Sequence, residues 1–331
     1  MTQPRNLVFQ SPKAMNSATT RLEQQEAQDG VLIVHKETGW TSHDVVAKIR
    51  ALLKESKVGH AGTLDPNATG VLPILVGRAT RIAEYLVDWD KEYRAQLRLG
   101  ETTDTQDATG RTLARTDLGG VTEADLQRVL TSFRGLQQQL PPMYSAVKVG
   151  GQRLYKVARA GKTIDRAERP IMIHKLELVS FDGRDALLQI VCSKGTYVRT
   201  LCADIGQALG VGGHMFALER RRVGPLSIEQ ALTIDQVASH LKARTLSSQF
   251  RSLDELLFEF PTVVVNAEQA QRVLHGAPLP SAGGGQSLSL LGAGIVRLKD
   301  EAGRLLAIGA QDGTDLGAIK VRKVLSLSSH S

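Results

Sequence analysis

Apolar and polar residues alternate strictly along residues 91–99. One face of this segment carries Tyr93, Ala95, Leu97 and Leu99, and the other carries Arg94, Gln96 and Arg98. A period of two residues predicts a strand with one buried face. Continuous apolar runs over residues 31–34 and 71–76 predict two further strands that are more completely buried. The pattern also predicts strands over residues 144–149, 171–181, 186–192 and 216–223.

Apolar positions spaced three or four residues apart predict helices between these strands. Thr41 or Ser42 can cap a first helix, which we expect to end near Lys57. A capping pattern at Thr122 predicts another helix over residues 122–133. Further helices are expected over residues 78–86, 154–160 and 198–209. Strands and helices mix without a regular βαβ repeat, which predicts an α+β fold on a mostly antiparallel mixed sheet.

The character of the sequence changes twice along the 331 residues. Residues 1–30 are polar and rich in glutamine, without the apolar core of a signal peptide, so we expect a disordered extension. After Pro261, short apolar runs and Gly-rich turns indicate a small β-rich domain over residues 261–331. The large α+β domain of this prediction therefore spans residues 31–260.

Composition narrows the class of protein. Hydrophobic residues make up 42% of the chain and charged residues 23%, as in ordinary globular proteins. No apolar stretch reaches the roughly 20 residues that cross a bilayer. The two cysteines form no metal-ligand pattern, so we expect a protein of the reducing cytoplasm without structural zinc. The net charge of +7 favours a polyanionic partner, and the three arginines at 220–222 are assigned to structural support or phosphate contact.

One acidic side chain stands out because the backbone around it is stiff. Asp65 lies in the loop of residues 59–70, which contains three glycines and Pro66. Proline fixes its own backbone and restricts that of the preceding residue. A carboxylate held in this way suggests a reactive group, and the alternative is an ordinary Asp–Pro turn in a glycine-rich connection. No phosphate-cradling lysine motif follows the glycines, which disfavours a nucleoside-triphosphate site.

Arg199 is a candidate partner of Asp65. It lies in the segment 193–199, between a predicted strand and a predicted helix, where loops present side chains to clefts. A planar guanidinium can bond a carboxylate through two hydrogen bonds and lower its pKa. The alternative interpretation is that Arg199 is a solvent-exposed residue of the helix. Tyr93, on the apolar face of its strand, is either a core residue or a platform on which a nucleobase stacks.

Two other side chains stay open to more than one interpretation. His60 either orients the Asp65 loop or contacts a ligand, and the structural role is the more common one. Lys148, at the end of the segment 141–148, either meets a phosphate or simply ends a strand. The eight histidines show no zinc spacing, and no serine lies in a nucleophile-elbow motif.

The motifs, taken in their order along the chain, resemble those of one enzyme family. The matching segments are GHAGTLDPNATG (59–70), KEYR (91–94), LGETTDTQDATG (99–110), PPMYSAVK (141–148), GQRLY (151–155), CSKGTYVRT (192–200) and LERRRVGP (218–225). Over residues 31–226 they closely resemble the bacterial tRNA pseudouridine-55 synthases, the TruB family. The C-terminal segment is more loosely similar to the small PUA-like domain of these enzymes. Glu37 departs from the family, which usually has proline there, and residues 1–30 have no counterpart.

The resemblance implies that a T-loop uridine of tRNA, at position 55, becomes pseudouridine without a cofactor or a metal. It implies that Asp65 is the catalytic aspartate and that Arg199 pairs with it. It also implies that Tyr93 stacks on the flipped uracil and assists proton transfer. The implied substrate-binding residues are His60, Tyr197, Leu218, Lys148 and Lys36. Whether Asp65 attacks the sugar, attacks the base or removes a proton stays open.

The implied substrate also sets requirements for binding. A uridine that is stacked and paired in folded tRNA must be flipped out, at a cost of a few kcal/mol. Phosphate contacts along the T arm can offset that cost, which suits two basic domains. We expect a cytoplasmic monomer without an obligate protein partner or membrane contact. Two alternatives are a non-catalytic helper of RNA folding and a catalytic subunit of a guide-RNA particle of the dyskerin type.

Overall fold

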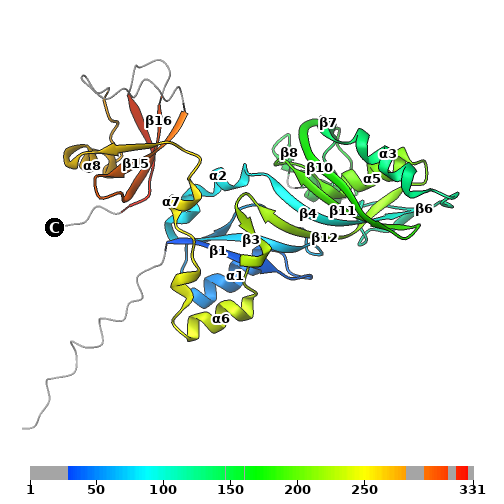
Figure 1. Ribbon diagram of the computed structural model, residues 1–331, viewed down its shortest axis with the longest axis horizontal. Helices are drawn as coiled ribbons and strands as arrows, with labels where there is room; N and C mark the ends of the chain where they lie inside the picture. The colour runs from blue at the N-terminus through cyan, green and yellow to red at the C-terminus, as the bar shows by residue number, and fades with distance from the viewer. Residues whose placement is uncertain (1–28, 146, 160, 281–293, 312–317, 327–331) are drawn as a thin grey trace, which may run out of the picture.

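The computed structural model describes residues 29–145, 147–159, 161–280, 294–311 and 318–326. Figure 1 shows a large sheet with helices on its faces and, to one side, a smaller sheet formed by the C-terminal part of the chain. The expected disordered extension over residues 1–30 falls almost entirely outside the described residues. None of the helices in the described ranges is long and apolar enough to cross a membrane.

A nine-stranded sheet forms the centre of the molecule. Its main strands run in the order β1 (Gly30–Lys36), β3 (Thr69–Val76), β12 (Gly213–Val223), β4 (Lys91–Leu99), β11 (Asp185–Cys192), β10 (Arg169–Phe181) and β7 (Gly135–Gln139). Two short strands extend it: β2 (Val58–His60) pairs with β3, and β13 (Leu226–Ser227) pairs with β12. The strand pairs are antiparallel apart from β3 with β12, which run parallel through Thr69–Glu219 and Gly70–Arg220. The predicted α+β fold on a mostly antiparallel mixed sheet is confirmed.

The half of the sheet formed by β4, β11 and β10 buries one face. Tyr93 and Leu97 of β4 join an apolar cluster with Ile190 of β11, whereas the alternate residues of β4 are partly or fully exposed. Helices α3 (Glu123–Ser132) and α5 (Val198–Ala208) pack on the buried face. The half-buried strand predicted over residues 91–99 is therefore confirmed.

The other half of the sheet is buried on both faces. In β3, Leu72 packs with α1 (Ser42–Leu53) and α6 (Ile234–Lys242), whereas Val71 joins an apolar cluster on the opposite face that includes Leu86 of α2 (Ala83–Val87). A strand covered on both sides carries an unbroken apolar run rather than an alternating one. The buried strands predicted over residues 31–34 and 71–76 are confirmed.

Local backbone signals decide where the first helix begins and ends. Thr41 caps α1 through a capping box with Asp44. The helix ends at Leu53, earlier than the expected Lys57, because Lys54 adopts the left-handed conformation with φ of 53°. The expected helix extent was therefore too long at its C-terminal end.

Other predicted elements are partly corrected. The expected helix over residues 78–86 consists of a 3₁₀ segment, η1 (Gly77–Ile82), followed by α2. The expected strand over residues 144–149 is reduced to β8 (Lys148–Val149), which forms a hairpin with β9 (Gln152–Arg153). The remaining short elements are β5 (Glu101–Thr103), β6 (Thr112–Arg115), α4 (Leu154–Arg159), η2 (Ile228–Gln230), η3 (Leu246–Gln249) and α7 (Leu253–Leu256). Strand β7 and helix α6 were not predicted.

The C-terminal part forms a separate small sheet. Its strands run in the order β14 (Thr262–Val265), β15 (Gly294–Asp300), β16 (Leu305–Gln311) and β17 (Ile319–Val324), and helix α8 (Ala267–Leu274) packs against them. Ile308 and Leu325 join the apolar cluster of β1, β3 and α7, so the two sheets share a core contact. The expected small β-rich domain is therefore present as a separate sheet.

Candidate active site

The loop that carries Asp65 lies between β2 and β3 and is held by backbone contacts. Ser42 Oγ accepts from the Leu64 N–H at 2.9 Å and donates to the Leu64 carbonyl at 3.2 Å. The Pro66 carbonyl accepts from the Gly39 N–H at 2.9 Å. These contacts tie both neighbours of Asp65 to α1 and to the turn that precedes it.

Gly70, at the end of this loop, permits a close approach of two strands. Its φ is +103°, and a Cβ added there would lie 2.2 Å from the Arg220 carbonyl oxygen. Any side chain at this position would therefore force β12 away from β3. The glycine allows the parallel contact of β3 with β12 directly beside the Asp65 loop.

Lys36 is fully buried against the same loop. Its Nζ donates to the carbonyls of Glu37, Trp40 and Pro66 at 3.0, 2.6 and 3.0 Å. Burial lowers the pKa of Lys36 to about 8, against the opposing effect of the Asp65 carboxylate. An ammonium group has three protons, and these carbonyls use all three. Lys36 thereby holds the carbonyl that follows the carboxylate.

Arg199 brings two carboxylates together. Its Nη2 lies 3.1 Å from Oδ2 of Asp65, and its Nη1 lies 3.7 Å from Oδ2 of Asp107. Nη2 also donates to the Tyr144 carbonyl at 3.0 Å. The Arg199 side chain is 8% exposed and that of Asp65 is 38% exposed. The expected contact between Arg199 and Asp65 is present, and its burial argues against a solvated helix residue.

The electrostatics of Asp65 differ from what the sequence suggested. Burial is the largest effect and raises the pKa of Asp65 above its ordinary value. Arg199 lowers this pKa, Asp107 raises it and Lys36 lowers it. We expected the guanidinium to dominate, but the loss of water around the carboxylate outweighs it. A desolvated carboxylate is a stronger base than one in water, which suits a reacting group.

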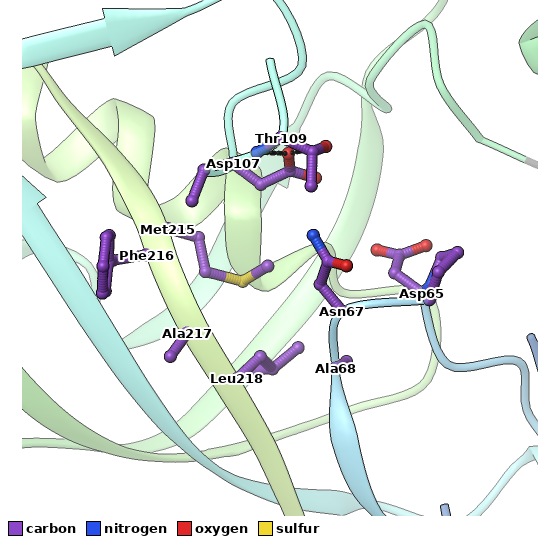
Figure 2. A pocket seen from close by; sticks show the side chains of 11 residues that line it. Asp65, Asn67, Ala68, Asp107, Thr109, Met215, Phe216, Ala217 and Leu218 are labelled. Atoms are coloured by element: carbon purple, nitrogen blue, oxygen red, sulfur yellow. Dashed lines mark hydrogen bonds between the residues drawn. The ribbon is translucent and has the colours of Figure 1, made fainter. Parts of the chain in front are cut away.

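A cleft of about 430 Å³ opens beside Asp65. Its walls come from the Asp65 loop, the turn after β5 and strand β12: Asp65, Pro66, Asn67, Ala68, Asp107, Ala108, Thr109, Met215, Phe216, Ala217 and Leu218. Figure 2 shows Asp65 and Asn67 on one side of the cleft and Met215 and Leu218 on the strand across from them.

Tyr93 lies on the buried face of β4 and is 8% exposed. Burial raises the pKa of its phenol to about 12, so the phenol is neutral near pH 7. A side-chain hydrogen bond joins the phenol to Arg220, and the Asp65 carboxylate is close enough to affect the phenol's pKa. The expected inward position is confirmed. Among the described residues, however, Tyr93 is not one of those that line the cleft.

His60 lies at the end of β2, edge-on to the ring of His43, with ring centroids 5.5 Å apart. Burial lowers the pKa of His60 to about 4, so its ring is neutral near pH 7. Its Nδ1 is buried and has no hydrogen-bond partner within the described part of the chain. Buried polar atoms are normally bonded, so this nitrogen is an exception among the described residues.

Of the other predicted binding residues, some line the cleft and others do not. Leu218 lines the cleft and packs against the apolar clusters of both halves of the sheet. Tyr197 precedes α5, where its backbone N–H donates to Gln139 Oε1 at 2.8 Å. The Tyr197 ring centroid lies 5.9 Å from the Arg199 guanidinium carbon, although Tyr197 is not among the described lining residues. The side chain of Lys148 lies outside the described part of the structure.

Asp107 is the site residue that sequence reasoning missed, because it was treated as part of a polar turn. Its Oδ1 accepts from Thr105 Oγ1 at 2.7 Å. It also accepts from the N–H and Oγ1 of Thr109 at 2.9 and 2.6 Å, and Figure 2 shows Thr109 beside Asp107. These bonds leave Oδ2 facing the guanidinium of Arg199. The dense run of aspartates and threonines was the available signal. The cleft residues Asn67 and Met215 were also missed.

The chemical groups of the cleft suit proton transfer or nucleophilic attack by a carboxylate. Asp65 is exposed to the cleft on one side and held by a buried guanidinium on the other. Within the described ranges, no group of three or more histidine, cysteine, aspartate or glutamate side chains could hold a metal ion.

Two family models match adjoining parts of the chain. The model of the TruB family pseudouridylate synthase N-terminal domain matches residues 50–198, which contain Asp65 and Tyr93. The model of the tRNA pseudouridylate synthase B C-terminal domain matches residues 199–263, which begin at Arg199. The chain belongs to the TruB family of pseudouridylate synthases. Neither model extends to β15, β16 or β17 of the small sheet.

Several curated relatives of this TruB-family chain carry the name tRNA pseudouridine synthase B. The protein of Bacillus licheniformis is 44% identical over 90% of this chain and 97% of its own length. The protein of Symbiobacterium thermophilum is 46% identical over 80% of this chain and 85% of its own length. The protein of Pseudomonas aeruginosa is 41% identical over 89% of this chain and 95% of its own length.

Solved structures extend the comparison to more distant members of the fold. A chain in a Cbf5-Nop10-Gar1 complex matches with a TM-score of 0.70 and 28% identity, over 91% of this chain and 86% of that one. A chain in an H/ACA RNP bound to a substrate RNA containing 2′-deoxyuridine matches with a TM-score of 0.70 and 25% identity, over 98% and 96%. The fold of the TruB-family chain is thus shared with a chain of a protein complex and with a chain of an RNP bound to a substrate RNA.

Proposed function

We propose that this TruB-family chain converts a uridine in the T loop of tRNA, at position 55, into pseudouridine. The observation that carries the proposal is Asp65, whose carboxylate faces the cleft and contacts a buried guanidinium. The three relatives named tRNA pseudouridine synthase B support tRNA as the substrate. They also favour a free-standing enzyme over a subunit of a guide-RNA particle.

The reaction exchanges one bond for another within a single nucleotide. The bond between uracil N1 and ribose C1′ breaks, the base turns, and a bond forms between C5 and C1′. C5 loses a proton and N1 gains one, so no electrons pass to or from a second reactant and no redox cofactor is required. The step needs a group that can attack the sugar or the base, or remove a proton. We assign that role to Asp65.

Arg199 has two tasks in this proposal. It fixes the direction of the Asp65 carboxylate, because its Nη2 lies 3.1 Å from Oδ2 while Asp107 contacts the other side of the guanidinium. Its positive charge also offsets part of the cost of ionising a desolvated carboxylate. Both tasks require the guanidinium to stay in one position, which its burial supports.

The remaining residues are proposed to bind the flipped nucleotide. Leu218 packs against the base from the wall of the cleft, and Tyr93 stacks on the uracil and assists proton transfer. Tyr197 contributes to the wall behind Arg199. His60, with its unsatisfied nitrogen, contacts the RNA beside the vacated position of the base. Removing the base from its stack costs a few kcal/mol, which these contacts and phosphate contacts must offset.

The two parts of the chain are proposed to share the RNA. Residues 31–260 form the catalytic domain, and residues 261–331 form a PUA-like domain that contacts the tRNA outside the cleft. The net charge of +7 supports phosphate contacts along the T arm. We propose a monomer that works in the cytoplasm without an obligate protein partner.

The proposal is tested with the purified protein, an unmodified tRNA transcript and buffer alone. Mapping pseudouridine nucleotide by nucleotide should find it at position 55 and at no other uridine. A transcript with cytidine at position 55 is the matched control and should remain unmodified. Modification elsewhere, or none without an added protein or guide RNA, would contradict the proposal.

A further inference from the structure

Arg220 is a buried cation at the junction of the reactive segments. It lies on β12 and is 1% exposed. Its Nε donates to the Val71 carbonyl at 2.8 Å, and its Nη2 donates to the Gly62 carbonyl at 2.8 Å. A further side-chain hydrogen bond joins it to the phenol of Tyr93. One guanidinium thus contacts β3, the Asp65 loop and the tyrosine of β4.

The strand register explains why these groups meet. Arg220 and Tyr93 are direct partners in the antiparallel pairing of β12 with β4. Opposite residues in such a pair have side chains on the same face, about 5 Å apart at Cβ. On its other edge, Arg220 pairs with Gly70 of β3. Arg220 therefore lies on the strand between β3, which follows the Asp65 loop, and β4, which carries Tyr93.

Its position has an electrostatic cost. Within the described part of the chain, no carboxylate lies within ion-pair distance of Arg220, and burial lowers the pKa of the guanidinium. Its charge also lowers the pKa values of the nearby Lys36 and His60. A buried charge without a counter-ion is unfavourable, so its hydrogen bonds to the two carbonyls and the phenol are what keep it in place.

The directions of these hydrogen bonds are fixed by chemistry. Guanidinium nitrogens only donate, so the Tyr93 oxygen accepts from Arg220 and keeps its own proton for another acceptor. The same guanidinium holds the Gly62 carbonyl, three residues before Asp65. We propose that Arg220 is a positioning residue of the reaction, which sets the phenol of Tyr93 and the loop of Asp65 in a fixed relation. This inference rests on the proposed roles of Asp65 and Tyr93.

The test compares Arg220→Lys with Arg134→Lys. Lysine retains the charge but cannot reach the loop and the phenol at once. Arg134 is the matched control, because its Nε and Nη2 also donate to a backbone carbonyl, that of Leu176 on β10, at 3.1 and 2.8 Å. We expect Arg220→Lys to slow single-turnover pseudouridine formation about 100-fold, since misplacement by about 1 Å can cost that much. The Kd for tRNA should change by less than about threefold, and Arg134→Lys should leave both quantities unchanged.

A double-mutant cycle separates positioning from a purely structural role. If Arg220 acts through the phenol, Arg220→Lys should slow the Tyr93→Phe variant by much less than it slows the wild type. An equal loss in both backgrounds, an unchanged rate in Arg220→Lys, or a loss confined to tRNA affinity would overturn the inference. If Tyr93→Phe alone reacts at the wild-type rate, the proposed role of Tyr93 fails and the inference falls with it. If Tyr93→Phe is slow but Arg220→Lys is not, only the inference fails.

Discussion

Two ion-pair groups in this molecule have opposite arrangements. At the cleft, one guanidinium, that of Arg199, stands between the carboxylates of Asp65 and Asp107. Between the two sheets, one carboxylate, that of Asp254, stands between Arg297 Nη1 at 2.9 Å and Lys299 Nζ at 2.6 Å. The first group has an excess of negative charge and faces a cleft, whereas the second has an excess of positive charge and joins two parts of the chain.

The comparison shows that the surroundings of an ion pair determine its role. Asp254 lies on α7, whose neighbours Leu253 and Leu256 pack in the cluster that the small sheet shares, so its pairs hold a domain contact. Asp65 has a buried partner but an open side, and burial raises its pKa instead of lowering it. A poorly satisfied carboxylate beside a cleft is suited to reaction, and a well satisfied one is suited to structure.

The largest effect is expected from Asp65→Asn, which removes the reacting charge and keeps the shape. Single-turnover pseudouridine formation should fall by about 10⁴-fold or more, the scale seen when a principal catalytic group is lost. The Tm and the Kd for tRNA should stay close to those of the wild type. Asp254→Asn serves as the control and should retain full turnover at saturation. A rate for Asp65→Asn within about tenfold of the wild-type rate would contradict the catalytic role of Asp65.

Arg199→Lys should have the next largest effect. Lysine retains the charge but offers no planar fork that can contact both carboxylates, so the direction of Asp65 is lost. We expect the single-turnover rate to fall about 100-fold at saturating tRNA. Arg304→Lys is the matched control, because Arg304 Nε bonds the Asp300 carboxylate at 2.7 Å next to β15 of the small sheet. Equal losses in the two variants would show that the cleft pair has no special role.

A smaller effect is expected at the junction of the two sheets. Asp254→Asn leaves Arg297 and Lys299 without a charged partner, which should lower the free energy of unfolding by about 1–3 kcal/mol. The Kd for tRNA should rise by less than about tenfold, a change of 1.4 kcal/mol, because the small domain is held less firmly. Single-turnover chemistry at saturation should be unchanged. A slower chemical step with an unchanged Kd would mean that the small domain helps to build the cleft.

The smallest effect concerns stability as a function of pH. Because burial raises the pKa of Asp65 above its ordinary 3.8, the protonated form is favoured by folding. This preference contributes to the free energy of unfolding below pH 3.8, and the contribution is lost as the pH rises through the raised pKa of Asp65. Asparagine does not ionise, so Asp65→Asn does not lose this contribution. The free energy of unfolding of the variant minus that of the wild type should therefore be larger at about pH 7 than at about pH 4. Denaturant titrations at several pH values measure this, and the opposite slope would mean that Arg199 dominates.

Local sequence signals predicted much of the fold. The alternation over residues 91–99 predicted β4, and the cap residues Thr41 or Ser42 predicted the start of α1. Strand β7 escaped prediction because its sequence, GLQQQ, has a single large apolar residue and is held by pairing with β10. The left-handed Lys54 that ends α1 also has no clear signal, since lysine rarely adopts that conformation.

The candidate site was predicted in part, and the limits have physical causes. The stiff loop singled out Asp65 and made Arg199 a plausible partner, and the family resemblance implied the pair. The pKa direction of Asp65 was wrong because it depends on how much water the fold removes, which sequence spacing does not report. The hydrogen bonds of Lys36 could not be predicted for a similar reason, since its three carbonyl partners come from backbone that only the fold brings together.

The central claim is that the Asp65 carboxylate meets a nucleoside that has left its stack. The most direct measurement is a structure of the Asp65→Asn protein bound to an unmodified tRNA. The account predicts that the uridine at position 55 lies flipped into the cleft, with the side-chain oxygen of residue 65 about 3–3.5 Å from a reacting atom of that nucleotide. A uridine that remains stacked in the T loop, or one that lies against other side chains away from residue 65, would contradict it.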